Sequence, residues 1–167
     1  MIESDYLKKN EDLLQKLRCM PSLKSFDDKA LKGALRLSKI RKYEPGELIL
    51  EEGQYDNWVY FLVSGKVRIV KGDKELSVLN RKGDVFGEMG IIDGSARSAS
   101  VYAVDETVCL ATDASYIDRL LGHDKVVFCS TLYQIFAEML AERLRLTSEE
   151  LVMARKEITE LKAQLGK

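Results

Sequence analysis

Residues Phe86 to Val101 combine a glutamate, a glycine-rich turn and an arginine at a spacing that could bind a sugar phosphate. A glycine followed by a short helical turn can direct several backbone N–H groups toward one anion. The guanidinium of Arg97 adds a permanent positive charge, and its planar fork matches phosphate oxygens. Glu88 would repel a phosphate, but it could accept a hydrogen bond from a neutral sugar hydroxyl. We call residues 86–101 the cassette, and we expect it to place an anion site beside a hydroxyl acceptor.

The other reactive residue types form no catalytic or metal-binding pattern. Cys19, Cys109 and Cys129 are far apart and odd in number, which favours reduced cysteines in a cytoplasmic protein over disulfides or a metal cluster. The single histidine, His123, has no Ser or Cys partner placed by a motif, so we expect a surface or capping role. We therefore expect no enzyme, no metal and no cofactor.

The charge balance excludes some classes of partner. The 26 basic and 27 acidic residues give a net charge of -1, which argues against broad capture of nucleic acid or of an anionic membrane. No apolar run approaches the length of a membrane span, and the N-terminus has acids where a signal peptide needs bases. The basic run from Arg36 to Lys42 could contact phosphate, but a solvated helix end and strand edge fits the balanced charge better.

The sequence pattern of residues 38–113 predicts a β-barrel. Short β-rich runs alternate with glycine-containing turns, among them Pro45-Gly46, which suits a type II turn, and Lys71-Gly72-Asp73-Lys74, which suits a tight hairpin. The cassette interrupts this rhythm and predicts a short helix plus a loop inserted in the barrel. The runs predicted as strands are Leu48–Leu50, Trp58–Val63, Val67–Val70, Leu76–Leu79, Ser98–Val104 and Val108–Ala111.

Helical segments are expected on both sides of the barrel. Residues 1–37 predict two helices, one capped near Asn10 and closed by Pro21, and one beginning near Asp27. In residues 114–167, Asp113 can cap a short helix that Gly122 would end. A long helix then begins near Asp124 and continues to Leu165.

The long helix carries a heptad repeat from about residue 137. Glu150 and Glu157 fall at g positions and face Arg155 and Lys162 at the e positions of a parallel partner helix. This pattern predicts a homodimer through the C-terminal helix, with packing of the apolar stripe against the barrel as the alternative. The apolar seam consists of Ala137, Leu144, Leu151, Ile158 and Leu165 at a, with Leu140, Thr147, Ala154 and Leu161 at d.

In its glycine spacing and its cassette, the sequence resembles the cyclic nucleotide-binding domain family, to which catabolite activator proteins, regulatory subunits of cyclic AMP-dependent protein kinase and cyclic nucleotide-gated channels belong. The resemblance covers residues 10 to 150 and is closest to the sensor domain of the catabolite activator group. It implies a mainly β fold, a double-stranded β-helix or jelly-roll barrel with N-terminal helices and a long C-terminal dimerisation helix. Its motifs are Pro45-Gly46-Glu47, Glu52-Gly53, Ser64-Gly65-Lys66-Val67, Lys82-Gly83-Asp84-Val85, Phe86-Gly87-Glu88-Met89-Gly90 and Ala96-Arg97-Ser98-Ala99-Ser100-Val101.

The resemblance also implies roles for single residues. Glu88 matches the glutamate that accepts the ribose 2′-hydroxyl, and Arg97 matches the arginine that binds the cyclic phosphate. Gly87 and Ser98 match donors around the phosphate. The ligand-binding residues expected in the cassette are Phe86, Gly87, Glu88, Met89, Arg97, Ser98 and Ala99.

The long helix carries a second match, because Thr147 and Ser148 resemble a Thr-Ser pair that reaches the adenine amino group from the same subunit and from its partner. Thr147 and Ser148 also lie at and beside the heptad seam, so both lines point to a homodimer that binds cyclic AMP. A cyclic GMP sensor stays open, because a hydroxyl after the cassette arginine can serve guanine in relatives. A ligand-independent dimerisation scaffold is the other alternative. The sequence ends at Lys167 without a helix-turn-helix, so we expect no nucleic acid binding by this chain.

Overall fold

The computed structural model describes residues 2–4, 20, 31, 35 and 38–165. Most of the two predicted N-terminal helices lies outside the described residues, but Leu31 and Leu35 are described, and both are helical and buried. The strands are β1 Ile2–Ser4, β2 Ser38–Tyr43, β3 Leu48–Leu50, β4 Trp58–Ser64, β5 Val67–Lys71, β6 Lys74–Leu79, β7 Val85–Phe86, β8 Ser100–Ala103 and β9 Thr107–Asp113. The helices are α3 Met89–Asp93, the 3₁₀ helix η3 Ala114–Arg119 and α4 Gly122–Leu165.

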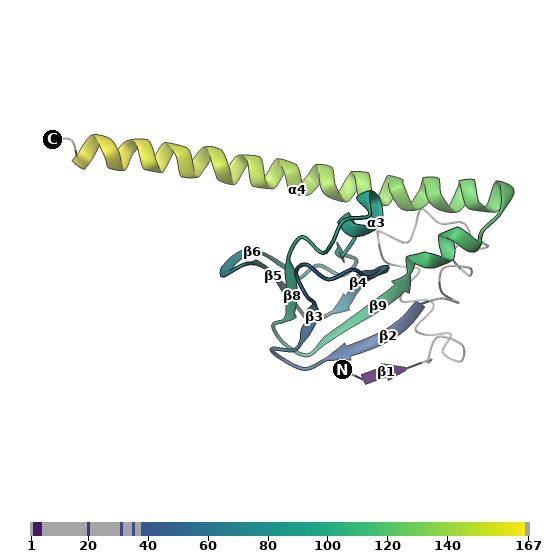
Figure 1. Cartoon of the computed structure of the whole chain (residues 1–167). Coiled ribbons are helices and arrows are strands. Elements are labelled where there is room, and N and C mark those ends of the chain that lie inside the picture. Colours follow the sequence, from purple (N-terminus) through teal and green to yellow (C-terminus); the bar gives the residue numbers. More distant parts are fainter. Residues whose placement is uncertain (1, 5–19, 21–30, 32–34, 36–37, 166–167) are drawn as a thin grey trace. The chain divides into compact units, whose positions relative to one another are not determined.

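The strands form two antiparallel sheets (Figure 1). One sheet has the order β1-β2-β9-β4-β7 and the other the order β3-β8-β5-β6. Each of the six predicted strands is present, and the short helix predicted inside the cassette is α3. The expectation of a mainly β fold with a C-terminal helix is therefore confirmed.

The core between the sheets explains the apolar run of β4. Tyr60 and Leu62 point into this core, and Val59 and Phe61, which alternate with them, are buried on the opposite face. Because β4 is buried on both faces, its sequence is a continuous apolar run rather than an alternating one. The core residues are Tyr43, Leu50, Tyr60, Leu62, Val67, Phe86, Val101, Ala103, Cys109 and Ala111.

The predicted turns follow glycine conformation. Gly46 has φ of 84°, and the Glu47 N–H donates to the Glu44 carbonyl at 3.0 Å, as in the type II turn expected there. Asp113 caps η3, accepting from the Ser115 N–H at 2.9 Å. The prediction that Gly122 ends this short helix is wrong: η3 ends at Arg119, and Gly122, with φ of 57°, begins α4.

The chain divides into two compact units, Met1–Leu132 and Tyr133–Lys167. The first contains both sheets and the cassette. The second is the remainder of α4, which carries most of the predicted heptads.

Candidate functional site

Arg97 is buried at the end of the cassette, with 3% of its side chain exposed. Its Nε donates to Oδ2 of Asp56 at 3.1 Å, and its Nη2 donates to the other carboxylate oxygen. The Nη2 group also donates to the Trp58 carbonyl at 2.5 Å, and Nη1 donates to the Gly87 carbonyl. The guanidinium is thus held by a forked carboxylate and two backbone oxygens, which fixes its direction as well as its charge.

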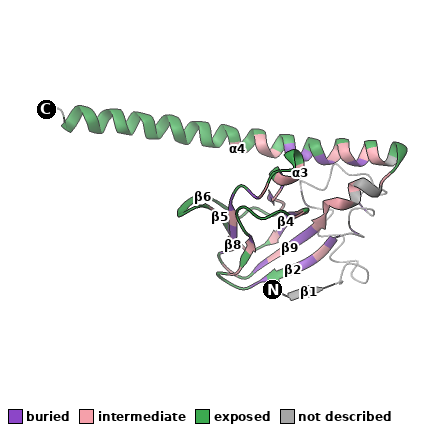
Figure 2. Cartoon of the chain, viewed as in Figure 1, coloured by how far each residue is buried: buried purple, intermediate pink, exposed green. Residues whose placement is uncertain are grey.

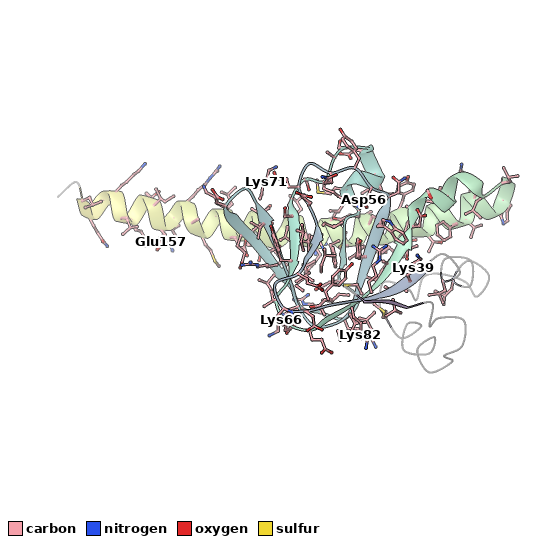
Figure 3. The ribbon with its side chains drawn as sticks, turned by 60° about the horizontal axis from the view of Figure 1, so that its bottom comes forward. Lys39, Asp56, Lys66, Lys71, Lys82 and Glu157 are labelled. Carbon is pink, nitrogen blue, oxygen red and sulfur yellow. The ribbon has the colours of Figure 1, made fainter. Side chains whose placement is uncertain are left out.

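The loop before β4 pairs with the cassette main chain. The Arg97 N–H donates to the Gln54 carbonyl at 2.8 Å, and the Gly53 N–H donates to the Arg97 carbonyl at 2.9 Å. Asp56 in the same loop accepts the Trp58 N–H at 2.8 Å. In Figure 3 the labelled Asp56 lies at the same end of the barrel as α3, whereas Lys66 and Lys82 lie at the opposite end. The loop therefore places Asp56 where the cassette brings Arg97.

Gly87 lets the backbone approach the arginine. Its φ is 82°, a conformation that residues with a side chain rarely adopt. A Cβ at this position would lie 3.0 Å from Arg97 Nη1 and 3.0 Å from the Trp58 carbonyl oxygen. At Gly90 a Cβ would lie 2.9 Å from the Ser95 carbonyl oxygen. The two glycines thus make the space into which the cassette folds around Arg97.

Glu88 is the N-cap of α3 and is 3% exposed. Its carbonyl accepts the N–H groups of Ile91 and Ile92, both at 3.0 Å, and Gly94 ends the helix with φ of 69°. Burial lowers the local dielectric, so a hydrogen bond accepted by the Glu88 carboxylate is stronger than it would be in water. Glu88 directly precedes α3 and Arg97 follows it, so the short helix separates the two residues along the chain.

The remaining cassette residues divide between surface and core. Ser98 is exposed, and its hydroxyl donates to the sulfur of Met89 at 3.5 Å. Ala99 is buried. The Phe86 side chain belongs to the core and stacks on Tyr60 with the ring centroids 5.1 Å apart, so it anchors the start of the cassette. Whether these residues contact a ligand stays a prediction.

Thr147 and Ser148 belong to the second compact unit, in α4. Both are exposed, and the Ser148 hydroxyl donates to the Leu144 carbonyl at 2.7 Å, one turn back in the same helix. Their predicted contact with a base stays a prediction.

Asp56 and Trp58 were not predicted as parts of the site. The available signal was physical: a buried arginine needs an acid partner, and an acidic loop precedes the β4 run. That loop offers three acids, Glu51, Glu52 and Asp56, and only the structure shows which of them faces Arg97.

Among the described residues, no group of three or more His, Cys, Asp or Glu side chains could hold a metal ion. None of the helices in the described part of the chain is both long and apolar enough to cross a membrane.

The fold and the site define a small β-barrel with a buried arginine beside a glycine-lined turn. The family model "Cyclic nucleotide-binding domain" matches residues 40–124, and the chain belongs to this family. The cGMP-dependent protein kinase of Toxoplasma gondii is 37% identical over 84 residues, which are 50% of this chain and 8% of the kinase. The cAMP-dependent protein kinase regulatory subunit of Colletotrichum orbiculare is 29% identical over 136 residues, 80% of this chain and 34% of the subunit.

Among solved structures, the catabolite activator protein of Thermus thermophilus superimposes with a TM-score of 0.62 at 28% identity, covering 80% of this chain and 62% of that chain. The matched regions are only 8% and 34% of the lengths of the two curated relatives above. The resemblance to the family is therefore confirmed at the level of the cyclic nucleotide-binding regulatory domain.

Proposed function

We propose that this chain is a cytoplasmic sensor module that binds cyclic AMP in the cassette and relays the bound state through its C-terminal helix to a downstream effector. The observation that carries the proposal is the buried guanidinium of Arg97, held in direction by Asp56 at one end of the α3 turn, with the buried Glu88 at the other end. A fixed cation and a shielded carboxylate suit a ligand that has an anion and a hydroxyl close together.

The cyclic phosphate would bind at Arg97. An arginine has five N–H donors, and the hydrogen bonds described above use four of them, which leaves one on Nη1 for a phosphate oxygen. The backbone N–H groups of Met89 and Gly90 lie in the first turn of α3, where a helix provides no carbonyl partner for them. They can therefore also donate to the phosphate. Glu88 would accept a hydrogen bond from the ribose 2′-hydroxyl, so the negative charge of Glu88 would face a neutral group rather than the phosphate.

The base would be recognised by Thr147 of the same chain and by Ser148 of a second copy. This assignment rests on the heptad positions of these residues and on their resemblance to the Thr-Ser pair of the family. Ser148 now donates to the Leu144 carbonyl, so it can still accept a hydrogen bond from an adenine amino group. Cyclic GMP stays the alternative ligand, because the hydroxyl of Ser98 could serve guanine. The relatives include both a cGMP-dependent protein kinase and a regulatory subunit of a cAMP-dependent protein kinase. Titration of the protein with both nucleotides side by side separates the two.

Replacing the arginine tests the phosphate site. We expect Arg97→Ala to weaken cyclic AMP binding by about 2 kcal/mol or more, because it removes a charge-assisted hydrogen bond from a partly buried phosphate. Isothermal calorimetry measures the change. Because the variant also unpairs Asp56, thermal unfolding and Arg97→Lys serve as controls. A folded Arg97→Ala protein with unchanged affinity would disprove the assignment. A wild-type protein whose unfolding temperature responds to neither nucleotide would favour the scaffold alternative.

Thr147→Ala tests the adenine contact. We expect this variant to bind cyclic AMP more weakly by about 1 kcal/mol, the typical contribution of one neutral hydrogen bond, while its unfolding temperature changes little. Calorimetry beside sedimentation velocity gives both readouts. If Thr147→Ala changes dimerisation and leaves the affinity for cyclic AMP intact, Thr147 is only a seam residue of the helix.

A further inference from the structure

Arg41 reaches across the inner face of the larger sheet. It pairs in register with Cys109 of β9, which pairs in turn with Leu62 of β4, and both neighbours belong to the core. The half-buried Arg41 side chain lies with its guanidinium carbon 4.1 Å from the ring centroid of Trp58. Its Nη1 donates to the hydroxyl of Tyr60 at 2.7 Å. Arg41 thus fixes two aromatic side chains of β4 by two different contacts.

Each of these aromatic residues supports one backbone oxygen that holds Arg97. Trp58 does so directly, because its carbonyl accepts from Arg97 Nη2 and its N–H donates to Asp56. Tyr60 does so through Phe86: the two rings stack with an interplanar angle of 5°, and the carbonyl of the next residue, Gly87, accepts from Arg97 Nη1.

Both carbonyls lie at strand ends, where side-chain contacts add to the support of the sheet. Trp58 is the first residue of β4 and pairs with Asp113 of β9, and Gly87 directly follows the two-residue strand β7. Burial raises the pKa of Tyr60, and the phenol therefore stays protonated at neutral pH and accepts from Arg41 as a neutral group.

We propose that Arg41 is a positioning residue of the nucleotide site, which fixes Trp58 and Tyr60 so that the backbone oxygens of Trp58 and Gly87 hold Arg97 in its phosphate-binding direction. The inference rests on the proposed function.

Arg68 offers a matched control. Its guanidinium carbon lies 5.2 Å from the ring centroid of Tyr102, but Arg68 is exposed on the smaller sheet. Arg68→Met removes the same charge and the same kind of ring contact as Arg41→Met, without touching a partner of Arg97. Trp58 is the only tryptophan of the chain, so its fluorescence reports directly on the ring that Arg41 covers.

The first experiment titrates wild type, Arg41→Met and Arg68→Met with cyclic AMP, with circular dichroism as the check on folding. We expect Arg41→Met to bind about tenfold more weakly, the effect of losing one partly desolvated cation–π contact, and to change the emission of Trp58. Arg68→Met should do neither. Equal affinities of the two variants would overturn the inference while the wild type and Arg97→Ala still support the proposed function. A wild type that binds no cyclic nucleotide would overturn the proposed function, and the inference with it.

A double-mutant cycle separates positioning from a general loss of stability. If Arg41 acts through Arg97, then Arg41→Met should cost much less affinity in the Arg97→Lys background than in wild type. Additive losses would overturn the inference.

Arg41→Lys keeps the charge and replaces Arg41→Met if the latter does not fold. We expect Arg41→Lys to recover only part of the wild-type affinity for cyclic AMP, because a lysine cannot both cover Trp58 and reach Tyr60 as the planar guanidinium does. Full recovery would assign the effect to net charge and overturn the positioning role.

Discussion

Gly87 has almost the same φ angle as Gly46, yet their surroundings differ. The φ values are 82° and 84°. A Cβ at Gly46 would meet nothing within 4 Å, whereas a Cβ at Gly87 would press on Arg97 and on the Trp58 carbonyl. The two glycines therefore separate the cost of a left-handed backbone from the cost of crowding the site.

Alanine at the two positions tests this difference. We expect both Gly46→Ala and Gly87→Ala to lose about 1 kcal/mol of stability through the positive φ, and Gly87→Ala to lose a further 1–3 kcal/mol or so through crowding. Only Gly87→Ala should weaken cyclic AMP binding, because only there does the new methyl group displace the guanidinium. Urea unfolding and calorimetry measure the two effects. Equal losses at both positions would mean that the site adapts to the extra atom.

At the scale of single residues, the sequence predicts those functional residues whose type is unusual in the surrounding sequence. A glutamate and an arginine around a glycine turn point to a ligand, and the structure buries both. Asp56 escaped prediction because an acid in a polar loop is ordinary, and its pairing with Arg97 bridges 41 residues of sequence. Arg41 escaped for the same reason, since it lies in a basic run that looks solvated.

Among the elements, most strands were predictable, including β3 with only three residues, whereas β1 and β7 were not. β4 carries six apolar or aromatic residues between its polar neighbours, whereas β1 has three residues and β7 two. Strands this short contain too few residues to show a period. They form because a longer neighbour offers a register, as when Val85 and Phe86 pair with Phe61 and Tyr60.

Strand β9 should make the protein sensitive to alkali through Cys109. Burial raises the pKa of this thiol to about 12, from an ordinary value of 9.0. Between these values the unfolded chain loses the proton and the folded chain keeps it. The stability is therefore fully present below about pH 9 and falls as the pH rises toward 12, by up to about 1.4 kcal/mol per pH unit for one thiol.

Chemical denaturation between pH 8 and pH 10 measures this slope. Cys109→Ala should be less stable than wild type at pH 8 but lose less stability on going to pH 10. The upper limit of pH 10 matters because burial also raises the pKa of Tyr43 and of Tyr60, whose contributions begin there. Identical slopes for wild type and Cys109→Ala would show that the thiol does not titrate as burial requires.

At the scale of the whole molecule, the second compact unit carries exposed apolar residues along its heptad seam. Leu144 is 68% exposed, and Leu151 and Ile158 are each 50% exposed. Every residue from 144 to 165 is exposed, as the green colour of this part of α4 shows (Figure 2). Apolar side chains repeated along one helix face in this way are typical of a coiled-coil seam. The sequence predicts this arrangement, because a heptad period is a local property that needs no knowledge of the rest of the fold.

A pair of neighbouring substitutions tests whether a second copy covers the seam. Leu151 lies at an a position, whereas Val152, which is 66% exposed, lies at b and faces away from the seam. We expect wild type to sediment as a dimer of 18.9 kDa chains. Leu151→Glu should weaken the dimer at least about tenfold, because it places a charge at the seam, and Val152→Glu should behave as wild type.

If Ser148 serves the partner's ligand, Leu151→Glu should also weaken cyclic AMP binding at protein concentrations where this variant is a monomer. A wild type that stays monomeric over the whole concentration range, or equal effects of the two substitutions, would contradict the dimer. A dimer whose dissociation leaves the affinity unchanged would confine the nucleotide site to one chain.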